Sequence, residues 1–332
     1  MLALPSRVTV LEGAPDALTF HRNHVAASIP ALIRGAVDSW PALERWKWAY
    51  LERHLGDQEF TVAVTPDGRA DAPLRLGDAA RAGLLSEQAW EYLKTHDPTT
   101  MLFVTPCEEK MSISKIASLI RSDDFDEHNP RVHYVQLQNN NLRGEWSSLL
   151  GDVDLSFPFA RDAFGCEPDA VNVWIGDERS TTSLHKDHYE NLYVVVTGKK
   201  HFTLYPPTAF PLLYEEPCIP AHYRERADGD TARLELAVDD AAERVPWIQV
   251  DPLNPDVFRF PRSVHARPLQ VTVSAGEMLY LPALWFHHVQ QEPDEEGKCI
   301  AVNLWYDMQF GLNWAYYNFM QGMTAQKSRP VM

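Results

Sequence analysis

The chain has 332 residues, of which 45% are apolar and 11% aromatic, so it can bury a large core. This composition excludes a disordered or fibrous protein. Its 30 Lys and Arg residues stand against 46 Asp and Glu residues, which gives a formal net charge of −16. A surface of that sign repels nucleic-acid phosphates and anionic membranes, so we expect neither as a partner and expect basic macromolecules instead.

Targeting signals and cysteine spacing bear on the compartment. Residues 1–7 lack a basic segment followed by a long apolar one, and the strongest apolar run, 278–286, is far shorter than the roughly 20 residues of a bilayer-spanning helix. The four cysteines, Cys107, Cys166, Cys218 and Cys299, form no C-x-x-C pair, and no N-glycosylation sequon occurs. These features predict a protein of the cytoplasm, and also of the nucleus.

The first hundred residues combine helical and strand patterns. Apolar spacing predicts helices over 15–25 and 46–56, and strands are expected at 30–35 and 60–65. The stretch that follows, to about residue 95, is rich in Ala, Leu and charge and favours helix. We therefore expect a mixed α/β N-terminal region over residues 1–125.

From residue 132 onward, β-branched and aromatic runs recur every 8–15 residues. The runs lie at 132–137, 170–176, 191–196, 200–205, 270–273, 277–281 and 299–306. This rhythm is typical of an antiparallel sandwich or barrel, with a hairpin turn at Thr197-Gly-Lys. The segment 224–255, rich in Asp, Glu, Ala and Arg, is expected to be an insertion between strands. The predicted barrel covers 126–308, and an aromatic helical extension covers 309–332.

The most informative short pattern is His185-Lys-Asp-His-Tyr-Glu-Asn191. Residues two apart on a strand point the same way, so His185 and Asp187 are predicted to face one spot, as ligands of a shared metal would. A histidine of a second segment, Gly276 to Val289, lies one hundred residues downstream of Asp187, at His287. Two histidines and one carboxylate form a facial triad that suits Fe(II) and leaves coordination positions open. For the His185–Asp187 pair alone, an ordinary hydrogen bond at a strand end is the alternative.

These motifs, with Gly198-Lys-Lys-His-Phe202 and Val302-Asn-Leu-Trp-Tyr306, resemble the JmjC-domain 2-oxoglutarate-dependent oxygenases over about residues 130–308. The resemblance implies a mainly β fold, the double-stranded β-helix or cupin jelly roll, with the mixed α/β region before it and C-terminal helices after it. It implies Fe(II) as cofactor, held by His185, Asp187 and His287, with 2-oxoglutarate and O2 as co-substrates. His288 is then a neighbour of the metal site and not a ligand.

The expected co-substrate site follows from charge and from the same resemblance. The distal carboxylate of 2-oxoglutarate requires a cation inside the barrel, and Lys200 opens the strand after the predicted hairpin. A solvated hairpin lysine is the alternative, and it is the interpretation we prefer for Lys199. The resemblance further implies hydroxyl contacts from Tyr134 and Thr182, and asparagines near the metal and the keto acid at Asn191 and Asn303.

The resemblance is closest to members that hydroxylate lysine, and it implies a (3S)-lysyl hydroxylase acting on a GTP-binding protein of the developmentally regulated type. The acidic composition agrees with a basic target, and Asp177 and Glu178 are candidate recognition residues. Three alternatives remain open: a metal-dependent endopeptidase acting on basic histone-tail segments, a demethylase of the same segments, and a non-catalytic binding module. The aromatic C-terminal helix, with Trp314, Tyr316, Tyr317 and Phe319, is the expected surface of a homodimer.

Overall fold

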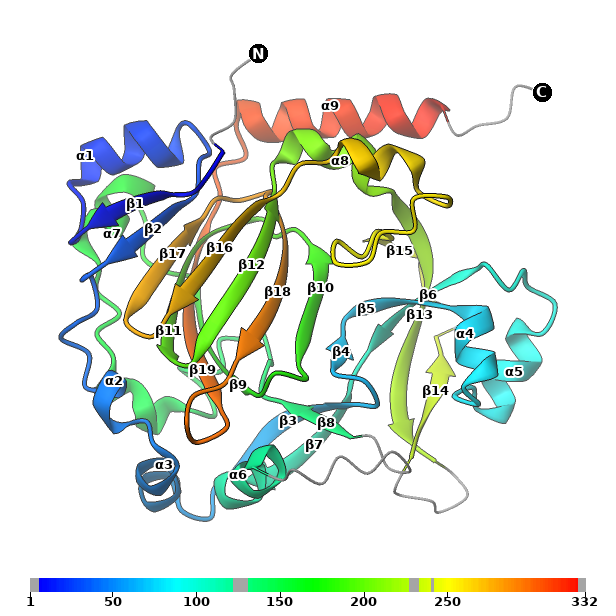
Figure 1. Ribbon diagram of the computed structural model, residues 1–332, viewed down its shortest axis with the longest axis horizontal. Helices are drawn as coiled ribbons and strands as arrows, with labels where there is room; N and C mark the ends of the chain where they lie inside the picture. The colour runs from blue at the N-terminus through cyan, green and yellow to red at the C-terminus, as the bar shows by residue number, and fades with distance from the viewer. Residues whose placement is uncertain (1–5, 122–130, 227–232, 240–241, 328–332) are drawn as a thin grey trace.

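The computed structural model describes residues 6–121, 131–226, 233–239 and 242–327, and its centre is a barrel of two facing sheets (Figure 1). The larger sheet has the order β1 (Thr9–Glu12), β2 (Ala31–Arg34), β17 (Glu277–Leu281), β11 (Tyr189–Thr197), β19 (Cys299–Asp307) and β9 (Ala170–Gly176). The smaller sheet has the order β16 (Leu269–Ser274), β12 (Lys199–Tyr205), β18 (Phe286–Glu292), β10 (Thr181–His185) and β4 (Arg69–Ala70). The pairing is antiparallel apart from β1 with β2 and β10 with β4, so the predicted jelly roll is confirmed.

Apolar residues fill the barrel from both sheets. Tyr193 and Val195 of β11 meet Phe202 of β12 and Val289 of β18 in one buried cluster. The alternate residues of β11, such as Val194, point out of the barrel into a second and larger core. Because this part of β11 is buried on both faces, residues 192–196 form a continuous apolar run, without the polar alternation of a solvated strand.

Helices cover the outer face of the larger sheet (Figure 1). The helices of the N-terminal half are α1 (Ala17–Phe20), continued by a π-helical turn (His21–Val25), α2 (Ala42–Arg45), α3 (Trp48–Leu55), α4 (Leu76–Arg81), α5 (Glu87–Leu93) and α6 (Ile113–Arg121). Later in the chain come α7 (Pro158–Phe164), α8 (Phe210–Leu213), α9 (Leu312–Lys327) and short 3-10 turns at Ser147–Asp152, Pro207–Ala209 and Pro261–His265. Four of these helices contribute side chains to the larger core outside the barrel, which we call the outer core: Phe20, Trp48, Ile116 and Phe159. The predicted helices at 15–25 and 46–56 are confirmed.

Two further sheets lie beside the barrel. One has the order β14 (Leu234–Val238), β13 (Glu215–Glu225), β6 (Met101–Thr105) and β5 (Ala72–Arg75), with β15 (Val245–Ile248) also paired to β13. The other has the order β7 (Cys107–Ser112), β3 (Glu59–Thr65) and β8 (Val132–Tyr134). The segment 224–255 lies between the barrel strands β12 and β16, as expected of an insertion, and contributes β14 and β15 to the first of these side sheets. One expectation needs correction: the stretch before residue 95 contains β4 and β5 as well as helices. These strands form because their partners, β10 and β6, are supplied by distant parts of the chain.

The turn between β11 and β12 brings Lys200 into the barrel. The expectation of a hairpin here is wrong, because β11 pairs with β17 and β19 whereas β12 pairs with β16 and β18, so the turn links the two facing sheets. Its turn residue Gly198 has a φ of 70°, and a Cβ atom there would lie 2.5 Å from the carbonyl oxygen of Glu292. Only glycine fits this position without moving the neighbouring strand. Directly after this turn, Lys200 pairs with Gln291 of β18.

The C-terminal helix α9 divides the aromatic residues that were assigned to a dimer surface. Tyr317 is buried and Trp314 is partly buried, and both pack with Phe210 of α8 in a small apolar cluster. Tyr316 and Phe319 remain exposed at 57% and 62%. None of the helices in the described ranges combines the length and apolar character that a bilayer crossing requires. The predicted boundary at residues 125 and 126 lies outside the described residues.

Candidate metal centre

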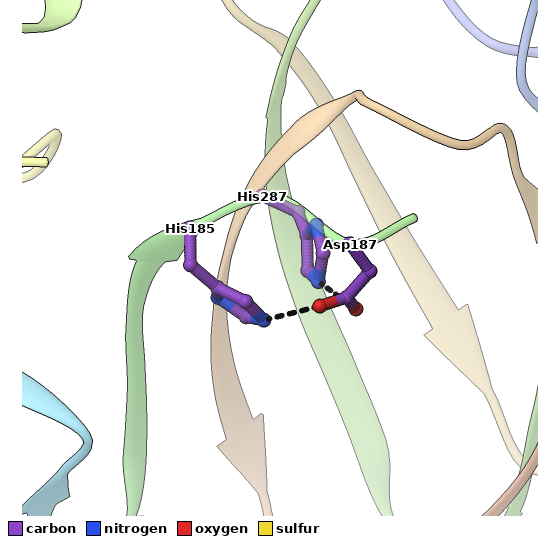
Figure 2. Close-up of side chains that lie close together, drawn as sticks. All are labelled: His185, Asp187 and His287. Carbon is purple, nitrogen blue, oxygen red and sulfur yellow. Dashed lines mark ion pairs between the residues drawn. The ribbon is translucent and has the colours of Figure 1, made fainter. Parts of the chain in front are cut away.

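Three side chains converge at one end of the smaller sheet (Figure 2). One ligand atom from each of His185, Asp187 and His287 lies within 4.8 Å of the other two. The Asp187 carboxylate lies 3.7 Å from His185 Nε2 through one oxygen and 3.6 Å from His287 Nε2 through the other. The structure therefore brings together the three residues that the sequence analysis proposed as metal ligands, from positions one hundred residues apart.

Strand pairing and one turn place these side chains. His185 is the last residue of β10, and its Cα pairs with that of His287 on β18, next to an irregularity in the register. Asp187 lies beyond the end of β10, so the expectation that it shares a strand face with His185 is wrong. Its position is set by the turn after β17, where the backbone N–H of Leu284, a residue with a φ of 67°, donates to the Asp187 carbonyl.

Both imidazoles are oriented by backbone carbonyl groups. The Nδ1 atom of His185 lies 2.8 Å from the Ser183 carbonyl oxygen, and that of His287 lies 3.0 Å from the Trp285 carbonyl oxygen. A carbonyl only accepts, so each Nδ1 carries the proton and each Nε2 presents its lone pair toward Asp187. This is the orientation that metal-binding histidines require.

The geometry and the charge state both fit a divalent metal. Two ligands bound to one ion at about 2.1 Å lie about 3 Å apart at a right angle, so a small contraction of the observed separations suffices. Burial, followed by the neighbouring His185 ring, lowers the pKa of His287 to about 4. Its imidazole is therefore neutral at pH 7 and able to donate its lone pair.

Lys200 lies deep in the barrel, 1% exposed. Its ammonium group donates to the Tyr134 hydroxyl at 3.0 Å and to the side-chain oxygen of Gln291. Within the described residues no carboxylate forms an ion pair with it. A buried cation with only neutral partners is costly to maintain and suits an anionic ligand. Lys200 and Tyr134 therefore fit the distal carboxylate of 2-oxoglutarate.

The remaining candidate residues are distributed more loosely. Asn191 and Asn303 are buried and meet each other, with Asn303 Nδ2 lying 3.4 Å from Asn191 Oδ1, while Asn303 also accepts from Trp174 Nε1 at 2.8 Å. Thr182 lies on β10 opposite Val289 and, among the described contacts, makes no hydrogen bond with Lys200. Asn191 and Asn303 are thus joined by a hydrogen bond, and Thr182 is not part of their hydrogen-bond network among the described contacts.

Sequence reasoning missed two residues of this region. Gln291 lies four positions after His287 on β18, so strand alternation places both on one face and could have indicated it. Trp247 of β15 stacks on the His185 ring at 5.9 Å between centroids and donates to the Ser183 hydroxyl at 3.2 Å. No local pattern identifies Trp247, because only the folding of the 224–255 segment brings it here.

The recognition role considered for Asp177 is wrong. Its side chain is 2% exposed and is ion-paired with Arg179, whose backbone N–H it also accepts at 2.9 Å. Its carboxylate is therefore already neutralised within the turn between β9 and β10. Glu178, the other candidate, is exposed, so a recognition role for it stays a prediction.

Comparisons with known proteins agree with this fold and site. Residues 17–312 match the model of the Cupin-like domain. The chain is 41% identical to the human bifunctional peptidase and (3S)-lysyl hydroxylase JMJD7 over 97% of this chain and 91% of that protein. It is 39% identical to the lysine-specific demethylase JMJ32 of Arabidopsis thaliana, over 100% of this chain and 91% of the relative, and 36% identical to JmjC domain-containing protein E of Dictyostelium discoideum, over 95% and 88%. The chain therefore belongs to the cupin-like JmjC family and is an enzyme of its 2-oxoglutarate-type dioxygenase class.

Proposed function

We propose that this protein is an Fe(II)- and 2-oxoglutarate-dependent protein hydroxylase that acts on the C3 carbon of a lysine residue in the (3S) sense. The observation that carries the proposal is the convergence of His185, Asp187 and His287, with the buried Lys200 deeper in the same barrel. The 41% identity to a (3S)-lysyl hydroxylase supports lysine as the target. The balanced reaction converts lysine, 2-oxoglutarate and O2 into hydroxylysine, succinate and CO2.

Each residue contributes binding or orientation. His185, Asp187 and His287 would hold the metal on one face and leave the opposite face open to ligands. Lys200 and Tyr134 would bind the distal carboxylate of the keto acid, while Trp247 shields the His185 ring from water. When bound, Fe(II) and 2-oxoglutarate supply the oxidising chemistry that inserts one oxygen atom of O2 into a C–H bond. The side chains of the protein position the metal and the keto acid and exclude water from the site.

The test is a coupled measurement of succinate and peptide mass. The protein is purified without oxygen and given Fe(II), 2-oxoglutarate, air and lysine-containing peptides. We expect one added oxygen on lysine with equimolar succinate, and loss of both in His185→Ala. The matched control is His201→Ala, which removes an exposed imidazole on β12. Succinate without any modified peptide would contradict the substrate, and absence of succinate would contradict the oxygenase.

The same experiment separates the alternatives once methyl-lysine forms of the peptides are included. The demethylase assignment of the Arabidopsis relative predicts loss of a methyl group from a methyl-lysine peptide. The peptidase assignment of the human relative predicts chain cleavage without succinate. A non-catalytic binding module would form no succinate and would leave every peptide unchanged. We propose hydroxylation ahead of these because no observation on this chain favours another outcome.

For the partner, we propose a GTP-binding protein of the developmentally regulated type. For this protein itself, we propose a location in the cytoplasm and also in the nucleus. The proposal on the partner is supported by the family resemblance and by the excess of acidic residues, which favours a basic target segment. All four cysteines are free thiols, which supports a reducing compartment. Peptides spanning the lysines of such a GTP-binding protein are the first to test.

We also propose a homodimer formed through α9. The support is a row of exposed apolar side chains on and before this helix: Phe310, Leu312, Tyr316, Phe319 and Met323. The double variant Tyr316→Ser and Phe319→Ser is expected to sediment as a monomer in analytical ultracentrifugation, whereas Trp90→Ser, which removes an exposed aromatic ring of α5, is expected to leave the dimer intact. A monomeric wild type at micromolar concentration would contradict the dimer.

A further inference from the structure

An acidic cavity of about 320 Å³ opens beside the metal centre. Asp71, Glu108, Thr105, Gln136 and Gln138 contribute its polar lining. Asp71 lies between β4 and β5, and Gln136 follows β8, two residues after Tyr134. The cavity is thus built from elements that flank the barrel and belongs to neither the ligand strands nor the keto-acid site.

Two contacts fix the cavity against the metal centre. The Ser183 hydroxyl of strand β10 donates to the Asp71 carbonyl at 2.6 Å, and Ser183 is also the residue whose carbonyl orients His185. The carboxylate of Asp71 is close enough for the His185 ring and Glu108 to influence its pKa, which burial, the largest effect, raises. The cavity therefore adjoins the strand that carries His185, through Asp71 and Ser183.

The carboxylates of the cavity lack cationic partners. Asp71 is largely buried and accepts one hydrogen bond, 3.1 Å from Gln136 Nε2. Across the described part of the chain no cation forms an ion pair with Asp71 or Glu108. Lys110, on the same face of β7 as Glu108, is paired with Glu145 instead. Asp71 also has a φ of 50°, a backbone conformation that is uncommon outside glycine and often marks functional positions.

We propose that this cavity binds the ammonium group of the substrate lysine, with Asp71 as the specificity-determining residue and Glu108 as the second carboxylate. The inference rests on the proposed lysyl hydroxylation. In lysine the ammonium nitrogen is four bonds from C3, the carbon to be hydroxylated, so C3 can sit at the metal while the ammonium reaches Asp71. A partly buried carboxylate with no internal cation gains a charge-assisted hydrogen bond when the ammonium enters.

The test measures binding apart from turnover. Fluorescent peptides of one sequence from a developmentally regulated GTP-binding protein, carrying either the lysine or norleucine at its place, are titrated into Mn(II)-loaded protein. Norleucine has the aliphatic chain without the ammonium. We expect the wild type to prefer lysine by about 10- to 100-fold, and Asp71→Asn to remove most of that preference. Asp57→Asn, an exposed aspartate outside the cavity, is the matched control and should keep it.

The outcomes distinguish this inference from the proposed function. A lysine preference that disappears in Asp71→Asn, without hydroxylation of the peptide, supports ammonium binding in the cavity and contradicts lysyl hydroxylation. Hydroxylation with an unchanged preference in Asp71→Asn supports the reaction and overturns the cavity. No preference in the wild type, or loss of Mn(II) binding in Asp71→Asn, also overturns it. Glu108→Gln, at the exposed end of the cavity, should keep the fold and weaken lysine binding by a smaller factor.

Discussion

Lys200 and Lys298 are both almost completely buried, at 1% and 0% exposure, yet their surroundings differ. Lys298, in the turn between β18 and β19, is paired with Asp294 at 2.8 Å and with Glu296, and lies 5.5 Å from the centre of a Trp48 ring. Lys200, inside the barrel, donates to the neutral oxygens of Tyr134 and Gln291 and lies 5.2 Å from the centre of the Tyr134 ring, but has no carboxylate partner among the described residues. The fold pairs the charge of Lys298 with two carboxylates, whereas the charge of Lys200 is available to an anionic ligand.

The same contrast separates the outer core from the metal centre. Asp152, which joins the N-terminal helices to the outer core, accepts from Arg45, Trp46 and Tyr50 at 2.6 to 3.0 Å. Asp187, at the metal centre, lies 3.7 Å from His185 Nε2 and 3.6 Å from His287 Nε2. Polar groups that the fold pairs internally contribute to stability, while those left without a counter-charge are available for function.

The largest effect is expected from removing Asp187. Asp187→Ala should lower the rate of succinate formation by at least about 10³-fold, roughly 4 kcal/mol, because the metal loses its only carboxylate ligand. The midpoint of thermal unfolding in the presence of chelator should change little, because Asp187 has no internal cation. Rate measurements and calorimetry check both parts. A fall in activity that only follows a fall in stability would contradict the prediction that Asp187 serves catalysis and not folding.

For Lys298, which is paired with carboxylates, we expect the opposite: a loss of stability with little change in activity. Lys298→Met should lower the free energy of unfolding by about 3 kcal/mol, since it leaves Asp294 and Glu296 without their cation. Turnover per folded molecule should stay near the wild-type value. Urea denaturation and active-site titration provide the measurement. Equal stability of the variant would mean that the ion pairs only balance the desolvation of the lysine.

The unpaired lysine completes the comparison. Lys200→Met should weaken 2-oxoglutarate binding by about 10- to 100-fold, the equivalent of roughly 2 kcal/mol, through loss of a charge-assisted hydrogen bond. The unfolding free energy without ligands should not fall below that of the wild type, because a buried charge without a counter-ion has been removed. Calorimetric titration into Mn(II)-loaded protein measures the affinity. Lys199→Met, which changes the exposed neighbour, is the control.

Sequence patterns identified the parts of the site that lie on regular strands. His185, His287 and Lys200 could be predicted because strand runs, the glycine turn at Gly198 and the spacing of the motifs indicate their positions. Trp247 and Asp71 could not, since their places depend on pairing between segments far apart in the chain. The strands inside the 224–255 insertion could not be predicted for the same reason: β13 and β14 need β6, more than one hundred residues earlier, to form a sheet.

The smallest effect concerns acid stability and the internally paired carboxylate. Burial acts to raise the pKa of Asp152, but hydrogen bonds from Tyr50, Arg45 and Trp46 outweigh it and hold this pKa below the ordinary value of 3.8. A lowered pKa in the folded state means that the stabilisation is complete above the unfolded value and is lost as the pH falls through the folded one. Asp152→Asn, which cannot ionise, should therefore be less stable than the wild type near pH 7, and the gap should narrow below about pH 4. Denaturation curves across this range measure it, and a gap that is independent of pH would show that Asp152 stabilises the fold by shape and not by charge.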